Sequence, residues 1–74
     1  MLEETNGIVK VAADQIIREI SFFDISGIKM CSHFFADEQV TLSKSELNLT
    51  KFGMYVVRIV TDEGIYVKKL YIRQ

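Results

Sequence analysis

The 74-residue chain contains no proline and no tryptophan, and it has one cysteine, one histidine and four glycines. A single cysteine excludes an intramolecular disulfide and has no partner cysteine for a zinc site. A chain of this length buries only about 60% of the surface of its unfolded state, so its stability is marginal without such staples. We therefore expect it to gain stability from a neighbouring domain or a second copy. Nothing in the sequence indicates a cofactor.

The sequence also lacks an excess of charge of one sign and any long hydrophobic run. Nine Lys and Arg residues oppose ten Asp and Glu residues, for a net charge of −1, and no basic stripe is present. This argues against a nucleic-acid partner. The apolar runs are too short to cross a bilayer, and the start M-L-E-E-T-N-G lacks the basic and apolar regions of a signal peptide. We expect no membrane span.

The C-terminal third carries the strongest structural signal. Two runs rich in β-branched and aromatic residues, Met54–Thr61 and Ile65–Ile72, flank a polar loop that contains Gly64. This pattern predicts an antiparallel β-hairpin. Alternation along the strands then assigns one face to the core. The residues expected to share an inward face are Tyr55, Val57 and Ile59 in the first run, and Leu70 and Ile72 share a face in the second.

Shorter strands are expected in the rest of the chain. For residues 16–25 an amphipathic helix is an alternative, but the turn signal at residues 24–27 favours a strand. The sequence predicts one antiparallel β-sandwich of about six or seven short strands over residues 7–74, preceded by a leader or linker remnant at 1–6. The further elements expected are strands at 7–12, 28–33 and 39–43, turns at 12–15 and 45–49, and a loop or an irregular edge at 34–38.

Cys31 and His33 lie two residues apart, which places them on one face of a strand. They could be a nucleophile with its base, or two metal ligands, but no third member completes either site. We therefore interpret them as a half-buried thiol and an edge histidine. The acidic pairs at 37–38 and 62–63 are neighbours in loops rather than carboxyls opposed across a cleft, so they are expected to be solvated. The sequence predicts no enzyme.

Two other patterns have more than one interpretation. Asn48-Leu49-Thr50 matches a glycosylation sequon, which is meaningful only in a suitable secretory pathway. Phe34, Phe35 and Phe52 could form an apolar contact patch for a partner, or they could fill the open end of a sandwich. We prefer the second interpretation.

Three segments resemble a known domain family. I-S-F-F-D-I-S-G-I-K-M at 20–30 is similar to the family's apolar-x-apolar-aromatic-Asp/Asn-x-x-Gly-x-x-apolar segment. L-N-L at 47–49 followed by G-M-Y-V-V-R-I at 53–59 is similar to a leucine-containing turn and a Gly-x-Tyr-x-Val-x-Ile strand. Gly64 to Ile72, with Lys69-Leu70, is similar to the closing strand. The family is the C-terminal sorting domain of the Por, or type IX, secretion system, and the resemblance covers roughly residues 16–73.

The resemblance implies an immunoglobulin-like β-sandwich at the end of a larger exported protein. Such a domain directs its cargo to an outer-membrane translocon, and a sortase then removes it, often joining the cargo to surface lipopolysaccharide. The protein would be secreted or held at the cell surface, with the periplasm as its route. The implied partners are the translocon and sortase proteins. The residues implied in recognition are Gly53, Tyr55, Gly64, Lys69 and Leu70.

An alternative function is an immunoglobulin-like adhesion or packing module that contacts an adjacent domain or forms a dimer. Family members commonly begin with a Pro-Asn-Pro-like segment, and this chain has no proline. We therefore expect either an abbreviated first strand or a chain that begins inside the domain. A strand missing from a sheet edge would leave free backbone groups, so homodimerisation by edge pairing is a further expectation.

Overall fold

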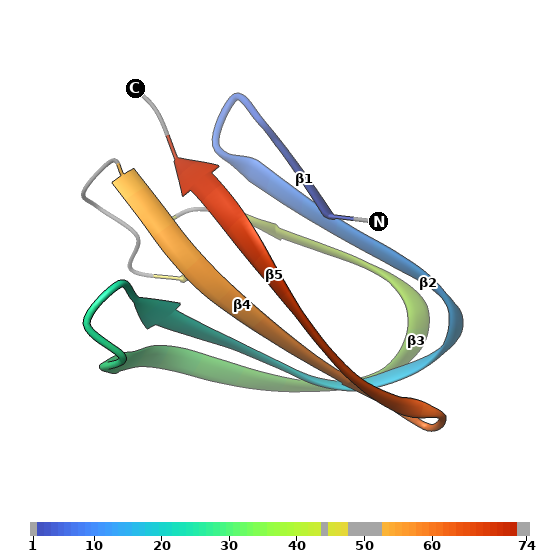
Figure 1. Ribbon diagram of the computed structural model, residues 1–74. Coiled ribbons are helices and arrows are strands. Elements are labelled where there is room, and N and C mark those ends of the chain that lie inside the picture. Colours follow the sequence, from blue (N-terminus) through green and yellow to red (C-terminus); the bar gives the residue numbers. More distant parts are fainter. Residues whose placement is uncertain (1, 44, 48–52, 73–74) are drawn as a thin grey trace.

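The computed structural model describes residues 2–43, 45–47 and 53–72, and these form five β-strands and no helix (Figure 1). All strand pairings are antiparallel, which confirms the predicted all-β antiparallel class. Within the described ranges, no helix has the length and hydrophobicity required to cross a membrane. The strands are β1 (Leu2–Thr5), β2 (Ile8–Asp24), β3 (Lys29–Ser43), β4 (Gly53–Thr61) and β5 (Gly64–Ile72).

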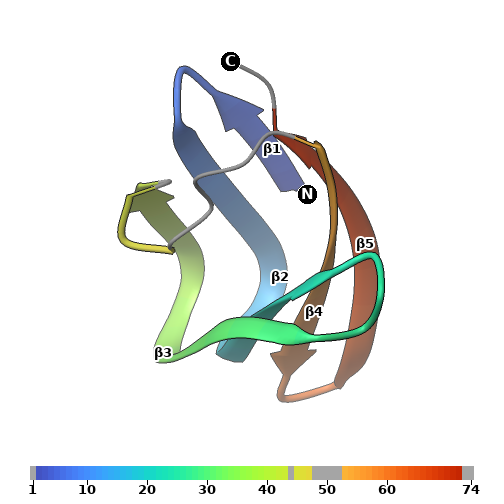
Figure 2. The ribbon, with the colours of Figure 1, turned by 90° about the vertical axis from the view of Figure 1, so that its left-hand side faces the viewer.

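Strand β2 is the centre of the sheet. Its first half pairs with β1 on one side, its second half pairs with β4 on that side, and β3 pairs with β2 along the other side. Strand β5 pairs with β4 and completes the order β1-β2-β4-β5. The sheet curls so that β1 also lies against β5, which gives a half-barrel (Figures 1 and 2). The predicted immunoglobulin-like sandwich of six or seven short strands is not confirmed, because the described residues form five strands.

The difference arises because β2 and β3 bend without breaking. The turn predicted at 12–15 is wrong, since this stretch lies inside β2. Residues 34–38 lie inside β3, so the loop alternative is wrong, whereas the irregular alternative agrees with a register shift between Ile17 and Glu19, whose partners are Asp37 and Phe34. Neither stretch contains glycine or proline, so the backbone can stay extended. The β2–β3 register shifts between Ala12 and Ile17, and such irregularities let strands turn the corner between layers. Each bent strand therefore supplies two of the short strands that were predicted.

The N-terminal residues also differ from expectation. Leu2–Thr5, expected in a leader or linker remnant, form β1 and pair with β2. The connecting Asn6 and Gly7 have φ angles of 53° and 81°, the positive pair that a two-residue type I′ hairpin turn requires. The dipeptide Asn-Gly is a strong hairpin signal, and it was missed because the run before it is only four residues long.

The stretch at 16–25 forms a strand as far as Asp24, as predicted, and the helical alternative is wrong. Ile20 and Phe22 are completely buried and point inward with the period of two. The strand ends at Asp24, whose Oδ1 accepts hydrogen bonds from the Ser26 amide at 2.9 Å, the Ser26 hydroxyl at 2.7 Å and the Ile28 amide at 3.0 Å. These bonds hold the pKa of the Asp24 carboxyl below its ordinary value, and the bond from the Ser26 hydroxyl has the largest effect.

The hydrophobic core fills the concave side of the curled sheet. The inward face predicted for the C-terminal hairpin is confirmed, because its five members are all at most 5% exposed. Leu47, in the connection between β3 and β4, is also fully buried in this cluster. The complete set of buried hydrophobic residues is Val9, Val11, Ile17, Ile20, Phe22, Val40, Leu42, Leu47, Tyr55, Val57, Ile59, Leu70 and Ile72.

Candidate functional site

The hairpin of β4 and β5 carries the residues for which recognition was expected. Its register runs from Gly53 opposite Ile72 to Thr61 opposite Gly64, with a two-residue loop of Asp62 and Glu63. This confirms the predicted hairpin. Because side chains alternate along each strand, the hairpin has a concave inner face in the core and a convex outer face.

The base of the hairpin loop is fixed to β2 by a hydrogen bond between the Thr61 hydroxyl and Gln15. The Thr61 hydroxyl lies 2.9 Å from Gln15 Oε1 and 3.0 Å from the Gly64 carbonyl oxygen, so its one proton can serve either acceptor. Its oxygen accepts a hydrogen bond from the Glu63 amide at 3.2 Å. Thr61 is only 6% exposed, which makes this a buried polar group with partners on both sides.

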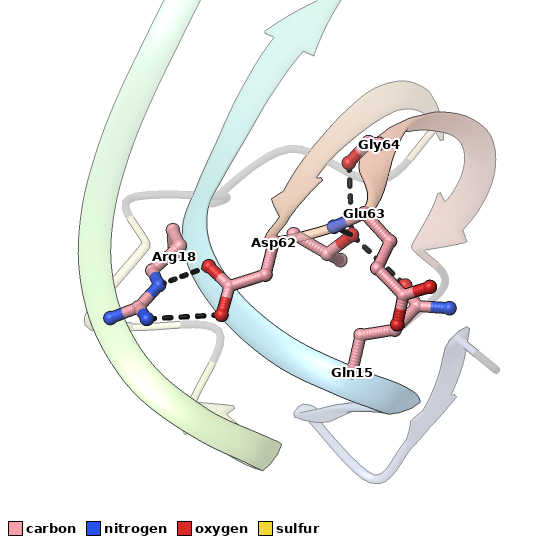
Figure 3. A network of polar contacts seen from close by, with 6 residues as sticks. Gln15, Arg18, Asp62, Glu63 and Gly64 are labelled. Atoms are coloured by element: carbon pink, nitrogen blue, oxygen red, sulfur yellow. Dashed lines mark hydrogen bonds and ion pairs between the residues drawn. The ribbon is translucent and has the colours of Figure 1, made fainter.

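A second contact fixes the tip of the loop. Arg18 on β2 donates from Nε to Asp62 Oδ1 at 2.6 Å and from Nη2 to Oδ2 at 3.0 Å, a bidentate pair (Figure 3). The Asp62 amide donates to the Ile16 carbonyl oxygen at 3.1 Å. The bond from Arg18 lowers the pKa of Asp62, and the same bond raises the pKa of Arg18. An exposed ion pair contributes little stability, so its main effect is to orient the loop.

The structure brings all five predicted recognition residues together in this hairpin, but it places them differently with respect to solvent. Tyr55 and Leu70 are opposite each other in the register and are each 5% exposed, so they shape the hairpin from inside. Gly53 and Gly64 begin the two strands with φ angles of 140° and 157°, where a side chain is rarely accommodated. Lys69 alone among the five projects an exposed side chain. The recognition role of these residues stays a prediction.

The outer face of the hairpin is a surface that the sequence analysis did not identify. Several of its apolar side chains are exposed, with values of 62% for Val67, 56% for Ile65 and 55% for Tyr71. Single exposed apolar residues are ordinary, whereas a contiguous row of them is typical of a contact surface. A signal was present, because β5 carries apolar residues on both faces. The outer face consists of the cross-strand pairs Met54–Tyr71, Val56–Lys69, Arg58–Val67 and Val60–Ile65.

A polar cluster on β2 and β3 borders this outer face. Ser21 is opposite Arg58 in the β2–β4 register and opposite Ser32 in the β2–β3 register. Glu19 Oε2 accepts hydrogen bonds from the Ser32 hydroxyl at 2.7 Å and the Ser21 hydroxyl at 3.3 Å. The bond from Ser32 is the main reason that the pKa of Glu19 is lowered. The outer face therefore has a hydrogen-bonded rim on one side.

Cys31 and His33 share one face of β3, as the spacing predicted, and the structure shows that this is the inner face, since they are opposite Phe22 and Ile20. The Cys31 thiol donates to the Leu47 carbonyl oxygen at 3.3 Å, and burial raises its pKa, which disfavours the reactive thiolate. His33 contacts Phe35 with ring centroids 6.4 Å apart, and its buried Nε2 has no hydrogen-bond partner among the described residues. No group of three or more His, Cys, Asp or Glu side chains suited to a metal ion occurs in the described ranges.

The remaining candidate residues do not form one site. Phe34 is 77% exposed, whereas Phe35 packs against the core, so the two neighbours point to opposite faces of β3. Phe52 and the sequon at 48–50 lie outside the described residues. Asp37 accepts a hydrogen bond from the Glu38 amide at 2.9 Å in an exposed part of β3, and Asp62 is engaged by Arg18.

Comparison with protein families identifies what the chain is similar to. The family described as the secretion system C-terminal sorting domain matches residues 5–73, which include β2, β3, β4 and β5. A comparison with curated proteins gives no match. The family match spans nearly the whole chain and agrees with the resemblance found in its sequence segments. The chain therefore belongs to the family of C-terminal sorting domains of the type IX secretion system.

Proposed function

We propose that the chain is a non-catalytic C-terminal sorting module of a larger exported protein, and that outer-membrane secretion machinery recognises the outer face of its β4–β5 hairpin. Family membership supports the sorting role and, with it, a destination outside the cell or on its surface. The observation that carries the finer proposal is the exposed apolar row of this face, on strands that the family match includes. Recognition through a surface requires exposed side chains, and Tyr55 and Leu70 are buried.

The composition of the outer face suits a protein partner. Apolar side chains of β5 and β4 supply area that can be buried, while Lys69 and Arg58 supply two cations on neighbouring cross-strand pairs. Such a combination of apolar contact and charge gives both affinity and orientation in protein interfaces. The partner surface would therefore be apolar with acidic groups opposite Lys69 and Arg58.

The anchored loop supports recognition by a preformed surface. Thr61 and Asp62 attach the hairpin to β2 through hydrogen bonds and the Arg18 ion pair. A surface that is already ordered loses less conformational entropy when a partner binds. The raised pKa of the Cys31 thiol is consistent with a non-catalytic role, because it keeps that group in its unreactive form.

The test is a sorting assay in a host with a working type IX system. A periplasmic reporter is fused ahead of the chain, and the fraction of reporter on the cell surface is measured. The unaltered domain should deliver the reporter, whereas Lys69→Ala and Val67→Ser should leave it in the periplasm. Lys10→Ala is the matched control, since Lys10 is an exposed strand lysine on β2, outside the hairpin.

Each variant is also purified and its melting temperature measured, which separates loss of recognition from loss of folding. Folded outer-face variants that still deliver the reporter would show that the machinery reads another surface. A folded, unaltered domain that never delivers the reporter would favour an adhesion or packing module. Deletion of β5 is a poorer test, because it removes Leu70 and Ile72 from the core.

A further inference from the structure

A groove of about 430 Å³ lies between the bend of β2 and the β4–β5 pair, and none of its lining residues belongs to the outer face of the hairpin. One wall is residues 11–15 of β2, and the other is formed by Ile59, Tyr66 and Lys68. Its size falls in the range of ligand sites. Its shape is set by the fold, because β2 leaves β1 at this bend and joins β4 only from Ile17 onward.

If β1 were extended toward its N-terminus in the register of the first hairpin, it would run along this groove. Leu2 pairs with Val11, and each step toward the N-terminus of β1 advances one residue toward the C-terminus of β2. A strand that continued β1 ahead of position 1 would therefore run beside residues 13–15, which line the groove. In the described part of the chain, these three residues take part in none of the ladder registers, although they belong to strand β2. The continued strand would therefore run beside an unpaired, extended edge of β2.

The opposite wall of the groove, which includes β5, is also suited to a strand that continues β1. Strand β5 pairs with β4 along all nine of its residues, and the much shorter β1 lies against only part of its other edge. Tyr66 Oη reaches Gln15 Oε1 at 3.5 Å, so one side chain already bridges the two walls. Lys68 has no carboxylate in ion-pair contact within the described residues. An exposed strand edge on each side is a template for an added strand.

We propose that this groove binds the linker that joins the domain to its cargo, as an extended strand that continues β1 between β2 and β5. The inference rests on the proposed function, which places a cargo ahead of the domain. The linker contributes backbone hydrogen-bonding groups to residues 13–15, and an acidic linker side chain on the inner side would meet Lys68. Proline at these linker positions removes the required N–H groups and opposes docking.

Cysteine cross-linking tests the predicted register. The domain is fused behind a small reporter through a linker of alternating threonine and valine, in a Cys31→Ser background. Because Leu2 pairs with Val11, the second linker residue ahead of position 1 should face Asp14. Paired strand residues are close enough for a disulfide. A cysteine there, combined with Asp14→Cys, should lose both free thiols on mild oxidation, whereas the same linker cysteine combined with Glu38→Cys on β3 should keep them.

Amide hydrogen exchange provides a second measurement on the fusion without added cysteines. The amides of residues 13–15 should exchange more slowly with the threonine–valine linker than with a linker of equal length that contains proline at alternate positions. Retained thiols in the Asp14→Cys fusion, or equal exchange with the two linkers, would overturn the proposal. Neither result depends on sorting, so a linker that fails to dock on a domain that still delivers its reporter rejects this inference and leaves the proposed function intact.

Discussion

For single residues, the face of the strand on which a side chain lies decides its role in this small protein. Val57 is completely buried opposite Lys68, while Val67 on the next strand is 62% exposed opposite Arg58. The two valines belong to the same hairpin and differ mainly in the side of the sheet to which they point. Composition alone cannot separate them, but alternation does.

Val57→Asp should prevent folding. An unpaired carboxylate in the core costs several kcal/mol, and a domain of this size has only about 4–11 kcal/mol of stability in total. Val67→Asp is the matched control and should melt close to the parent. Circular dichroism with thermal melting measures both variants. A Val57→Asp protein with the parent's melting temperature would show that the assigned inward face is wrong.

Acid should destabilise the fold through three carboxyls. The pKa values of Glu19, Asp24 and Asp62 are all lowered in the folded protein by hydrogen bonds, from Ser32, Ser26 and Arg18 respectively. A lowered folded-state pKa stabilises the protein above the ordinary values of 4.5 for Glu and 3.8 for Asp, and this contribution is lost as the pH falls through the folded-state pKa. The melting temperature should therefore fall below about pH 5.

The contribution of Asp24 can be isolated by substitution. Asp24→Asn should lower the melting temperature at pH 7 and should reduce the further fall between pH 5 and pH 2, because the amide has no charge to lose. Asp14→Asn is the control, since Asp14 is an exposed residue of the same strand and its carboxylate accepts no hydrogen bond from the described residues. Identical pH profiles for Asp24→Asn and the parent would contradict this assignment.

Among the structural elements, the C-terminal hairpin depends on one buried hydroxyl as much as on its strand pairing. Thr61 connects the end of β4 to Gln15 on β2 and to both sides of its own loop. Its removal would leave the Glu63 amide without that acceptor and the Gln15 and Gly64 oxygens without that donor. The hairpin and the bend of β2 should therefore loosen together.

Thr61→Val should lower the free energy of unfolding by about 1–3 kcal/mol, because it removes a hydrogen-bonding group from a nearly buried position while keeping its shape. Thr41→Val on β3 is the control, since Thr41 is exposed and the same change of shape occurs there. Urea denaturation measures both. Equal stabilities would mean that the Thr61 hydroxyl contributes no net stabilisation.

The elements also show what the sequence could and could not predict. The C-terminal hairpin followed from alternation and a polar loop, and the strand in residues 16–25 followed from the turn signal after it. The bends could not be predicted by local rules, since residues 12–15 and 34–38 break the alternation of apolar and polar side chains, whereas pairing on either side of each bend keeps β2 and β3 continuous. The hairpin that carries the candidate site was predicted correctly, but the exposure of its outer face depends on which side the core covers.

For the molecule as a whole, the arrangement of edges predicts self-association of the isolated chain. Strand β1 has four residues and cannot cover the nine residues of β5, and the net charge of −1 opposes contact only weakly. Light scattering across a concentration series should show a mass that rises above 8.5 kDa. A mass that stays constant up to millimolar concentration would mean that the β5 edge is already protected.

The central position of β2 also has a kinetic consequence. Its second half pairs with β4, and its Arg18 contacts Asp62, which is 44 residues further along the chain. Strand β5 must then pair with β4 before the core is closed. Folding is slower when contacts join distant parts of the chain, because loop closure must precede the contacts that compensate for it. During synthesis, this domain therefore cannot complete its core until β5 has emerged from the ribosome. Until then the core would stay open on the side that β5 covers.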